Sequence, residues 1–369
     1  MKVNPTKVVI PMEDQELIFE DLKEVFSSGR LTLGGFTQRF ENELKELLAS
    51  QYVSAVSSGS SALEIACLSL ELKSKEVIIP SNTFIATPIS FKRNGAIVRY
   101  ADCDPHFGCI TLDEIKRLHN SNTRAVVVVH IGGIIVPEIL SIRDYCKKNN
   151  LLLIEDAAHA IGASLKDIQA GTFGDIGTFS LYPTKVITSG EGGIVVTKHK
   201  NLHSEFEIYR DQGKLDFSNN LHVRFGSNWR MSELHAILGY FQLKRLSNFI
   251  DARNKVALTY KSEICNERIK FVSPVEEGST NWYKVFFILE EGIDRESFKS
   301  KLKDRGVLCG GEVYKVPCHR QPITKIDSIE FPGTESFTNR HICLPVSADM
   351  SEAEVQHVCD AINSVLKMA

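Results

Sequence analysis

The stretch from residue 151 to residue 194, LLLIEDAAHAIGASLKDIQAGTFGDIGTFSLYPTKVITSGEGGI, decides the fold. Its apolar run from Leu151 to Ile154 predicts a buried parallel strand that ends at Glu155-Asp156. A second strand is predicted from Ile176 to Leu181, and it runs into the turn Tyr-Pro-Thr-Lys that ends at Lys185. Open α/β sheets bind ligands at the carboxyl ends of their strands, where Asp156 is expected. Lys185 is expected to be a lone amine held in a turn.

An acid at a strand end and a lysine in a tight turn suit a binding site for pyridoxal phosphate (PLP). Lys185 would form a Schiff base with the cofactor aldehyde, and Asp156 would pair with the protonated pyridine nitrogen. Each residue alone has a simpler interpretation, because lysines in glycine-rich turns are usually solvated and an Asp after a strand often caps a helix. Their occurrence together in one motif favours the cofactor site, with Lys185 and Asp156 as its catalytic residues.

The words EDAAHA, GDIGTFSLYPTK and SGEGG resemble, nearly letter for letter, the DegT/StrS family of PLP-dependent sugar aminotransferases. The resemblance runs from about Leu31 to about Ser347. It implies an α/β fold of fold type I, like aspartate aminotransferase, with a large α/β/α domain around a mainly parallel sheet. From about Asp251 the segments become shorter and more charged, which indicates a smaller C-terminal α+β domain. We therefore predict domains at residues 1–250 and 251–369.

The composition is that of an ordinary globular protein, with 43% apolar and 24% charged residues among 369. A net charge of −3 leaves no electrostatic footprint for nucleic acid, and no apolar run has the length of a membrane span. The opening residues, MKVNPTKVVIPMEDQEL, carry acids where a signal peptide needs an apolar core. Nine cysteines without a C-x-x-C pair fit a reduced cytoplasmic protein. The neighbours Cys318 and His319 make poor paired zinc ligands, so no metal site is expected.

A turn of small residues between Val56 and Ala62 predicts a phosphate-binding helix N-terminus. Free backbone N–H groups and the helix dipole favour negative charge at such a turn. Serines also cap helices routinely, so the pattern alone is weak. The resemblance strengthens it by matching the family's phosphate loop to Gly59, Ser60 and Ser61, with a further hydroxyl from Ser180.

Two side chains near the predicted strand ends are implied to contact the cofactor. Phe84 matches the family's aromatic that stacks on the pyridine ring, although an aromatic just past a strand is most often part of the core. His159 follows Asp156 by three residues, so on a helix the two would share a face. The family has Gln or His there, beside the phenolic oxygen of the cofactor. His130, at another strand end, is interpreted as a neutral histidine that satisfies the loop backbone, with direct chemistry as the alternative.

Two loops are candidates for contacting the substrate. Residues 13–49 look helical, apart from residues 27–35, a loop with three glycines. The family has a similar loop near the mouth of its site, which makes Arg30 a candidate, although a plain connection between helices fits equally. His319 lies in a loop that loosely resembles the family's H-x-Q-P loop, which approaches the substrate.

A long helix is predicted from Glu233 to about Tyr260. The word G-x-N-x-R-M-S, which precedes this helix and ends at Ser232, implies a homodimer with shared sites. In the family its asparagine, here Asn228, reaches the PLP phosphate of the partner subunit, and Arg230 is a weaker second candidate. Asparagine is also a frequent turn residue, because its side chain bonds to its own backbone.

The resemblance implies a PLP-dependent aminotransferase that moves an amino group from an amino acid, such as L-glutamate, to a keto sugar. A nucleotide-linked keto-deoxysugar is the expected acceptor, used in surface-polysaccharide or related amino-sugar biosynthesis. A small phosphorylated ketone or a keto-cyclitol is the alternative acceptor. A catalytically inactive regulator on the same fold is the alternative of another class. Some relatives that catalyse dehydration have histidine in place of the lysine, so Lys185 favours transamination.

Overall fold

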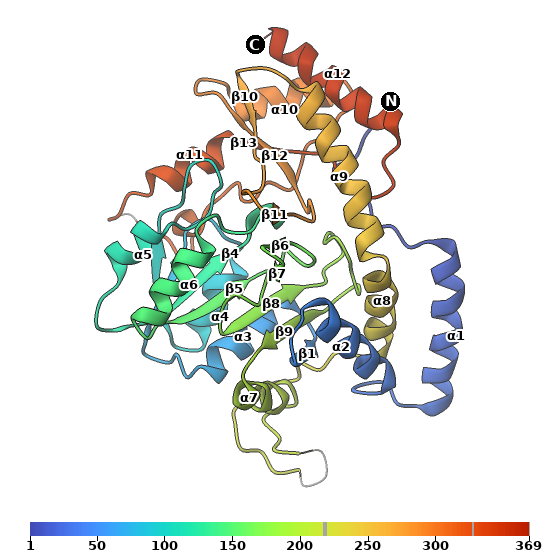
Figure 1. Ribbon diagram of the computed structural model, residues 1–369, viewed down its shortest axis with the longest axis vertical. Helices are drawn as coiled ribbons and strands as arrows, with labels where there is room; N and C mark the ends of the chain where they lie inside the picture. The colour runs from blue at the N-terminus through green and yellow to red at the C-terminus, as the bar shows by residue number, and fades with distance from the viewer. Residues whose placement is uncertain (217–219, 327, 369) are drawn as a thin grey trace.

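The computed structural model describes residues 1–216, 220–326 and 328–368. At its centre lies a seven-stranded sheet with the strand order β1-β9-β8-β5-β4-β2-β3 (Figure 1). Neighbouring strands run parallel, except that β9 runs antiparallel to both β1 and β8. The strands of this sheet are β1 (Tyr52–Val56), β2 (Glu76–Pro80), β3 (Ile97–Ala101), β4 (Thr123–Val129), β5 (Leu152–Asp156), β8 (Ile176–Ser180) and β9 (Gly193–Thr197).

The strand predicted to end at Asp156 is β5, and it lies in the middle of this sheet. It pairs in parallel with β4 on one side and with β8 on the other, so that Asp156 lies level with Val129 and Thr178. Both faces of β5 are covered, which explains its nearly continuous apolar sequence. The predicted parallel strand and the mainly parallel α/β architecture are therefore confirmed.

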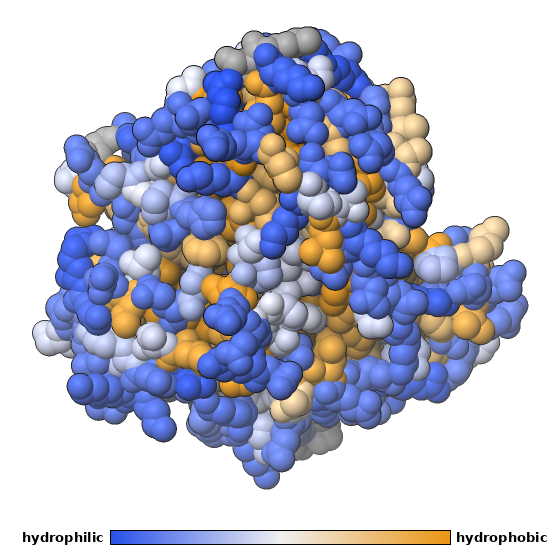
Figure 2. All heavy atoms as spheres, turned by 45° about the horizontal axis from the view of Figure 1, so that its top comes forward, coloured by the Kyte–Doolittle hydropathy of each residue, from blue (hydrophilic) through white to orange (hydrophobic). Residues whose placement is uncertain are grey.

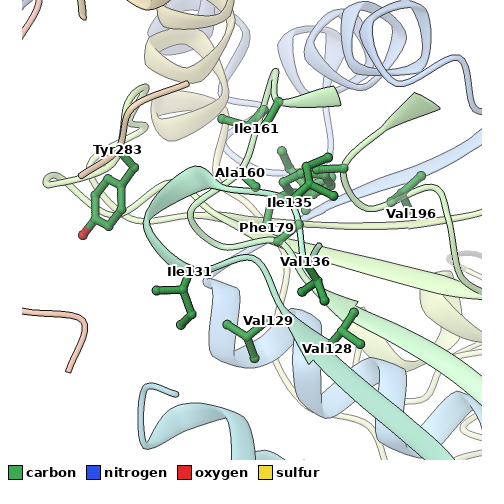
Figure 3. Close-up of a cluster of buried hydrophobic side chains, with 14 of the residues drawn as sticks. Val128, Val129, Ile131, Ile135, Val136, Ala160, Ile161, Phe179, Val196 and Tyr283 are labelled. Atoms are coloured by element: carbon green, nitrogen blue, oxygen red, sulfur yellow. The ribbon is translucent and has the colours of Figure 1, made fainter. Parts of the chain in front are cut away.

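Helices cover both faces of the sheet, and alternate residues of β4 point to different apolar clusters. Val126 and Val128 pack in one cluster with residues of α2, α6 and α8. Ala125 and Val127 pack in another with residues of α3 and α7. Figure 3 shows part of the first cluster, with Tyr283 at its margin. The helices of this part are α1 (Met12–Ser28), α2 (Gly35–Leu47), α3 (Gly59–Ser69), α4 (Ala86–Arg93), α5 (Leu112–Leu118), η1 (Ile131–Gly133), α6 (Ile139–Lys148), α7 (Lys200–Arg210) and α8 (Glu233–Lys244).

The C-terminal part is built around a second sheet, with the strand order β10-β12-β13. Its own apolar cluster also includes Val3 from the start of the chain. The predicted boundary at residue 250 falls inside α9, so this helix extends across it; the division at that residue stays a prediction. Elements here are α9 (Leu246–Glu263), β10 (Ile269–Phe271), β12 (Val285–Leu289), α10 (Arg295–Lys303), η2 (Cys318–Arg320), α11 (Pro332–Arg340), β13 (His341–Leu344) and α12 (Glu352–Met368). A small sheet joins β6 (Ser164–Leu165), β7 (Ile168–Gln169) and β11 (Gly278–Ser279).

Two expectations about helices were wrong. Residues 157–160 form a turn, not a helix, because Ala157 donates its N–H to the Thr178 carbonyl and so continues the pairing of β5 with β8. The helix expected from Glu233 to about Tyr260 is two helices, α8 and α9, which meet at Arg245. The Arg245 side chain bonds to the carboxylates of Glu13 and Asp14, so the junction is tied to α1. Among the described residues no helix is both long and apolar enough to cross a membrane.

Candidate active site

A cavity of about 450 Å³ opens at the carboxyl ends of the central strands. Its floor includes Asp156 at the end of β5 and Ser180 at the end of β8, and Gly59 lines it from the start of α3. The C-terminal part closes the opposite side with Tyr283 and with the segment Gly311–Tyr314. The site therefore lies between the strand ends of the central sheet and loops of the C-terminal part, as expected for an α/β sheet.

Asp156 is held in this cavity by two hydrogen bonds. Thr87, in the first turn of α4, donates its hydroxyl to Oδ2 at 2.7 Å, and the Ala158 N–H donates to Oδ1 at 3.1 Å. The Thr83 hydroxyl lies 2.8 Å from that of Thr87. Because Thr87 donates its proton to Asp156, Thr83 is the donor to Thr87. Burial raises the pKa of Asp156, while these two donors and the nearby Lys185 oppose the rise. The donors leave the carboxylate fixed in direction and able to meet a cation inside the cavity.

Lys185 presents a buried amine to the same cavity. The turn is closed by a hydrogen bond from the Lys185 N–H to the Tyr182 carbonyl, and Nζ lies 4.7 Å from the centre of the Tyr283 ring. Burial lowers the pKa of Lys185 to about 8, Lys284 contributes to the lowering, and Asp156 opposes it. Near neutral pH a useful fraction of this amine is therefore unprotonated and nucleophilic.

His159 joins the strand ends to the C-terminal part of the molecule. The Gly132 N–H donates to its Nδ1 at 3.3 Å, so the ring proton lies on Nε2, which donates to the Tyr314 hydroxyl at 3.0 Å. The ring also packs against Tyr283, with centroids 4.4 Å apart and the two planes tilted by 33°. Burial lowers the pKa of His159 well below its ordinary value, and the two lysines lower it further. A neutral His159 therefore lies beside Asp156, brought there by a turn instead of the expected helix.

The start of α3 forms a cradle with free backbone donors. The Ser58 hydroxyl accepts the Ser61 N–H and the Ser61 hydroxyl accepts the Ser58 N–H, a reciprocal capping box. The N–H groups of Gly59 and Ser60 have no carbonyl partner within the helix and line the cavity. A Cβ on Gly59 would come within 2.9 Å of the Ser180 Cβ, so only glycine leaves this cradle open. Ser61 was predicted to bind the phosphate, but its side chain is engaged in the capping box with Ser58.

The described residues hold no group of three or more His, Cys, Asp or Glu side chains arranged to bind a metal ion. The donor set around the cavity instead consists of an amine, a buried carboxylate and backbone N–H groups. Such a set suits an organic ligand with a phosphate at one end.

Comparison with known proteins identifies the family. Residues 12–363 match the model of the DegT/DnrJ/EryC1/StrS aminotransferase family. The chain belongs to this family. The resemblance read from the EDAAHA, GDIGTFSLYPTK and SGEGG words is thereby confirmed, and the chain is a sugar aminotransferase by family.

Individual relatives agree with the assignment to the family. GDP-perosamine synthase of Escherichia coli O157:H7 is 31% identical over 95% of this chain and 95% of its own length. UDP-4-amino-4,6-dideoxy-N-acetyl-beta-L-altrosamine transaminase of Helicobacter pylori is 29% identical over 96% of this chain and 94% of its own. The crystal structure of ntda from Bacillus subtilis, with bound cofactor PMP, has a TM-score of 0.90 at 28% identity, covering 97% of this chain and 83% of that one. The expected fold is thus confirmed.

Besides Ser61, four predicted residues of this sugar aminotransferase do not line the cavity of their own chain. Arg30 donates to the Leu33 carbonyl within its loop, and Arg230 forms an ion pair with Asp211. His319 is buried, bonded to Ser81 and Glu335, and stacked on Phe331 with centroids 4.3 Å apart. Its hydrogen bonds hold the loop together, so it does not reach a substrate in this arrangement. Asn228 is exposed, and its backbone forms an isolated bridge with Asp211.

Two of the alternatives weighed for single residues are settled by the geometry. Phe84 is not part of the core, because 56% of its surface is exposed and its ring faces the cavity opposite Tyr314 at 5.8 Å. His130 serves the backbone, as interpreted: its Nδ1 accepts the Val136 N–H at 3.1 Å and its Nε2 bonds to Glu155 at 3.0 Å.

Several cavity residues were missed by sequence reasoning. Thr87 ends the word TFIAT, residues 83–87, that carries Phe84, but its own hydroxyl was not singled out. Tyr283 and Tyr314 come from the distant C-terminal part. Lys284, buried behind Tyr283, was also missed. A tyrosine-lysine pair just before a strand carries no local signal, because its role arises only when the two parts of the molecule meet.

Proposed function

We propose that this chain is a PLP-dependent aminotransferase that transfers an amino group from an amino acid to a nucleotide-linked keto-deoxysugar. The observation that carries the proposal is that Lys185 and Asp156 line the same cavity. The amine of Lys185 lies 4.7 Å from the centre of the Tyr283 ring. A lysine and a carboxylate in these positions are the two protein groups that PLP chemistry requires.

The residues of the cavity fit PLP. The N–H groups of Gly59 and Ser60 and the Ser180 hydroxyl would hold its phosphate, and Phe84 would cover one face of the ring. Asp156 would meet the pyridine nitrogen, Lys185 the aldehyde and His159 the phenolic oxygen. The cradle that a Cβ on Gly59 would fill supports this fit. When bound, PLP supplies an electron sink for the bond broken at the Cα of the amino donor.

The protein's own groups would position reactants and move protons. Lys185 Nζ, with a pKa of about 8, can accept the Cα proton of the donor and return it, because both of its protonation states are populated near neutral pH. Asp156, fixed by Thr87 and Ala158, would keep a cationic nitrogen protonated opposite it. Tyr283 and Tyr314 would exclude water from the inner side of the cavity.

A nucleotide-linked acceptor is supported by the names of the relatives, which act on GDP-linked and UDP-linked sugars. Surface-polysaccharide or related amino-sugar biosynthesis in the cytoplasm is the corresponding role, with L-glutamate as the proposed donor. A small phosphorylated ketone or a keto-cyclitol would be the acceptor if no nucleotide sugar is used.

A homodimer with shared sites is part of the proposal. Figure 2 shows apolar areas that interrupt a mostly hydrophilic surface. Large apolar side chains exposed at the cavity include Phe84 and Tyr182, and Phe225 is fully exposed near Asn228 in the chain. A second subunit would cover such side chains, and Asn228 is free to face it.

The test is to locate the cofactor and then to find the acceptor. Protein purified with PLP should be yellow, and borohydride reduction followed by peptide mapping should find the cofactor on Lys185. The same protein should then be assayed with L-glutamate and keto-deoxysugars linked to GDP, UDP or dTDP, with the Lys185→Ala variant as the inactive control. Attachment of PLP to another lysine would refute the proposed site. Turnover of a phosphorylated ketone, with no turnover of any nucleotide sugar, would make such a ketone the acceptor instead.

A further inference from the structure

Lys284 is a buried lysine for which the proposed chemistry has no use. It lies just before β12, and only 6% of its surface is exposed. Among residues 1–216, 220–326 and 328–368, no hydrogen bond or ion pair reaches its Nζ. Lysines are almost never buried without a partner, because removing an ammonium from water is costly. A buried cation of this kind is therefore expected to meet an anion that the chain itself does not supply.

The ammonium of Lys284 lies next to two residues that line the active-site cavity, Tyr283 and Gly311. Its Nζ is 5.1 Å from the centre of the Tyr283 ring, and Lys185 Nζ is 4.7 Å from the same centre. The two nitrogen atoms can thus be no further apart than these two distances taken together. Gly311, which lines the cavity, has a φ of +74°, and a Cβ there would lie 2.5 Å from the Lys284 Nζ. The glycine leaves the ammonium uncovered by a side chain at this point of the wall.

The charges around Lys284 do not balance it. The Glu312 carboxylate raises the pKa of Lys284, but Glu312 is already in an ion pair with Lys299. The Asp156 carboxylate raises the pKa of Lys185 and does not act on that of Lys284. Burial raises the pKa of the neighbouring Cys343 thiol to about 12, so it stays neutral. Burial also lowers the pKa of Lys284, with Arg253 contributing, as expected for a cation without a counter-ion.

We propose that Lys284 binds a carboxylate of the amino-acid donor. The inference rests on the proposed function, in which the donor's amine reacts at the position of Lys185 Nζ. A carboxylate of the same small molecule lies only a few bonds away, which is the separation available between the two lysines. A phosphate of a nucleotide sugar is the competing anion, and binding of GDP and UDP distinguishes it from the carboxylate.

Binding of glutarate, a dicarboxylate without an amine, tests the proposal directly. Lys284→Met removes the charge and keeps the length of the side chain, and Lys255→Met is the matched control at an exposed lysine of α9. Calorimetry on the PLP-loaded proteins should give a Kd for glutarate that is about 10- to 100-fold weaker in Lys284→Met, the loss expected for one charge-assisted hydrogen bond. The Lys255→Met variant should bind glutarate as the wild type does.

A neutral ligand separates lost charge from general damage. Wild-type protein should prefer glutarate to glutaramide by about tenfold or more, and this preference should disappear in Lys284→Met. The colour change that L-glutamate alone produces in the bound cofactor should saturate at a higher glutamate concentration in this variant. The proposal would be overturned if Lys284→Met still preferred glutarate to glutaramide as the wild type does. It would also be overturned if the variant bound GDP and UDP more weakly but glutarate equally well.

A measurement on the wild type keeps the test valid if the variant does not fold. Acetylation of Lys284, followed by peptide mass spectrometry, should be slowed by glutarate and not by GDP or UDP. Equal labelling with and without glutarate would overturn the proposal. Failure of borohydride to fix PLP on Lys185 would instead refute the proposed function, so the two failures are distinguishable.

Discussion

The amine of Lys185 is tuned by its burial, and this gives a pH prediction. Its pKa of about 8 means that the nucleophilic form becomes dominant above that pH. In cofactor-free protein, the rate of acetylation of Lys185 should rise to half its maximum near pH 8 and level off above it. Ordinary exposed lysines gain reactivity up to about pH 10. Peptide mass spectrometry across this range measures both, and a Lys185 rate that still climbs at pH 10 contradicts the prediction.

Asp156→Asn should show whether this carboxylate balances the pyridinium charge. An amide carries no negative charge, so turnover should fall by about two or more orders of magnitude. PLP should still bind, because the cradle at Gly59 and Ser60 is untouched. The acetylation midpoint of Lys185 should also move to lower pH, since Asp156 opposes the lowering of its pKa. Asp251→Asn, at an exposed position of α9, is the control. Near-normal turnover of Asp156→Asn would show that the Asp156 carboxylate has only a structural role.

At the scale of the elements, α2 has no cap of its own and is capped by Glu233 from α8. The buried Glu233 carboxylate accepts the N–H groups of Gly34, Phe36 and Thr37 and the Thr37 hydroxyl. One side chain thereby fixes the loop around Arg30 and joins the first turns of two helices. A Cβ on Gly34 would lie 2.5 Å from Glu233 Oε2, so the contact also requires the glycine.

Glu233→Gln should destabilise the protein by about 2–3 kcal/mol, because an amide turns one acceptor into a donor facing N–H groups. The measurement is the free energy of unfolding in urea, compared with Glu46→Gln at an exposed position of α2. Digestion within residues 29–34 should become faster at the same time. Equal stability of the two variants would show that the hydrogen bonds of Glu233 to the first turn of α2 do not stabilise the fold.

For the whole molecule, the exposed Asn228 makes shared active sites testable. Lys185→Ala removes the cofactor-binding amine, and Asn228→Asp would place a carboxylate against the phosphate of the partner's PLP. In a mixed dimer with shared sites, one site collects both lesions and the other is intact. Half the dimers are mixed at equal amounts with free exchange, so about a quarter of wild-type activity should return.

The controls for the mixed dimer are the two parent variants, each inactive alone, and mass labelling that confirms subunit exchange. If Asn228 served its own chain, every site in every dimer would carry a lesion. Confirmed exchange without recovery of activity would therefore exclude shared sites.

The central sheet could be predicted because its signals are local. The run Leu151–Ile154 is apolar throughout since both faces of β5 are covered, and Asp156 follows at the strand end. The capping serines of α3 and the turn before Lys185 are likewise set by neighbours in the chain. The sequence by itself therefore determined the α/β fold, the family and the expected positions of the lysine and the acid.

Only the tertiary structure decided which further groups surround them. His159 reaches the cavity through a turn, since Ala157 extends the strand pairing to Thr178 where a helix was expected. Tyr283, Lys284 and Tyr314 arrive from the C-terminal part, and His319 is taken up by contacts with Ser81 and Glu335. Such placements depend on packing between segments far apart in the chain, and hydrophobic periodicity and turn chemistry describe only near neighbours.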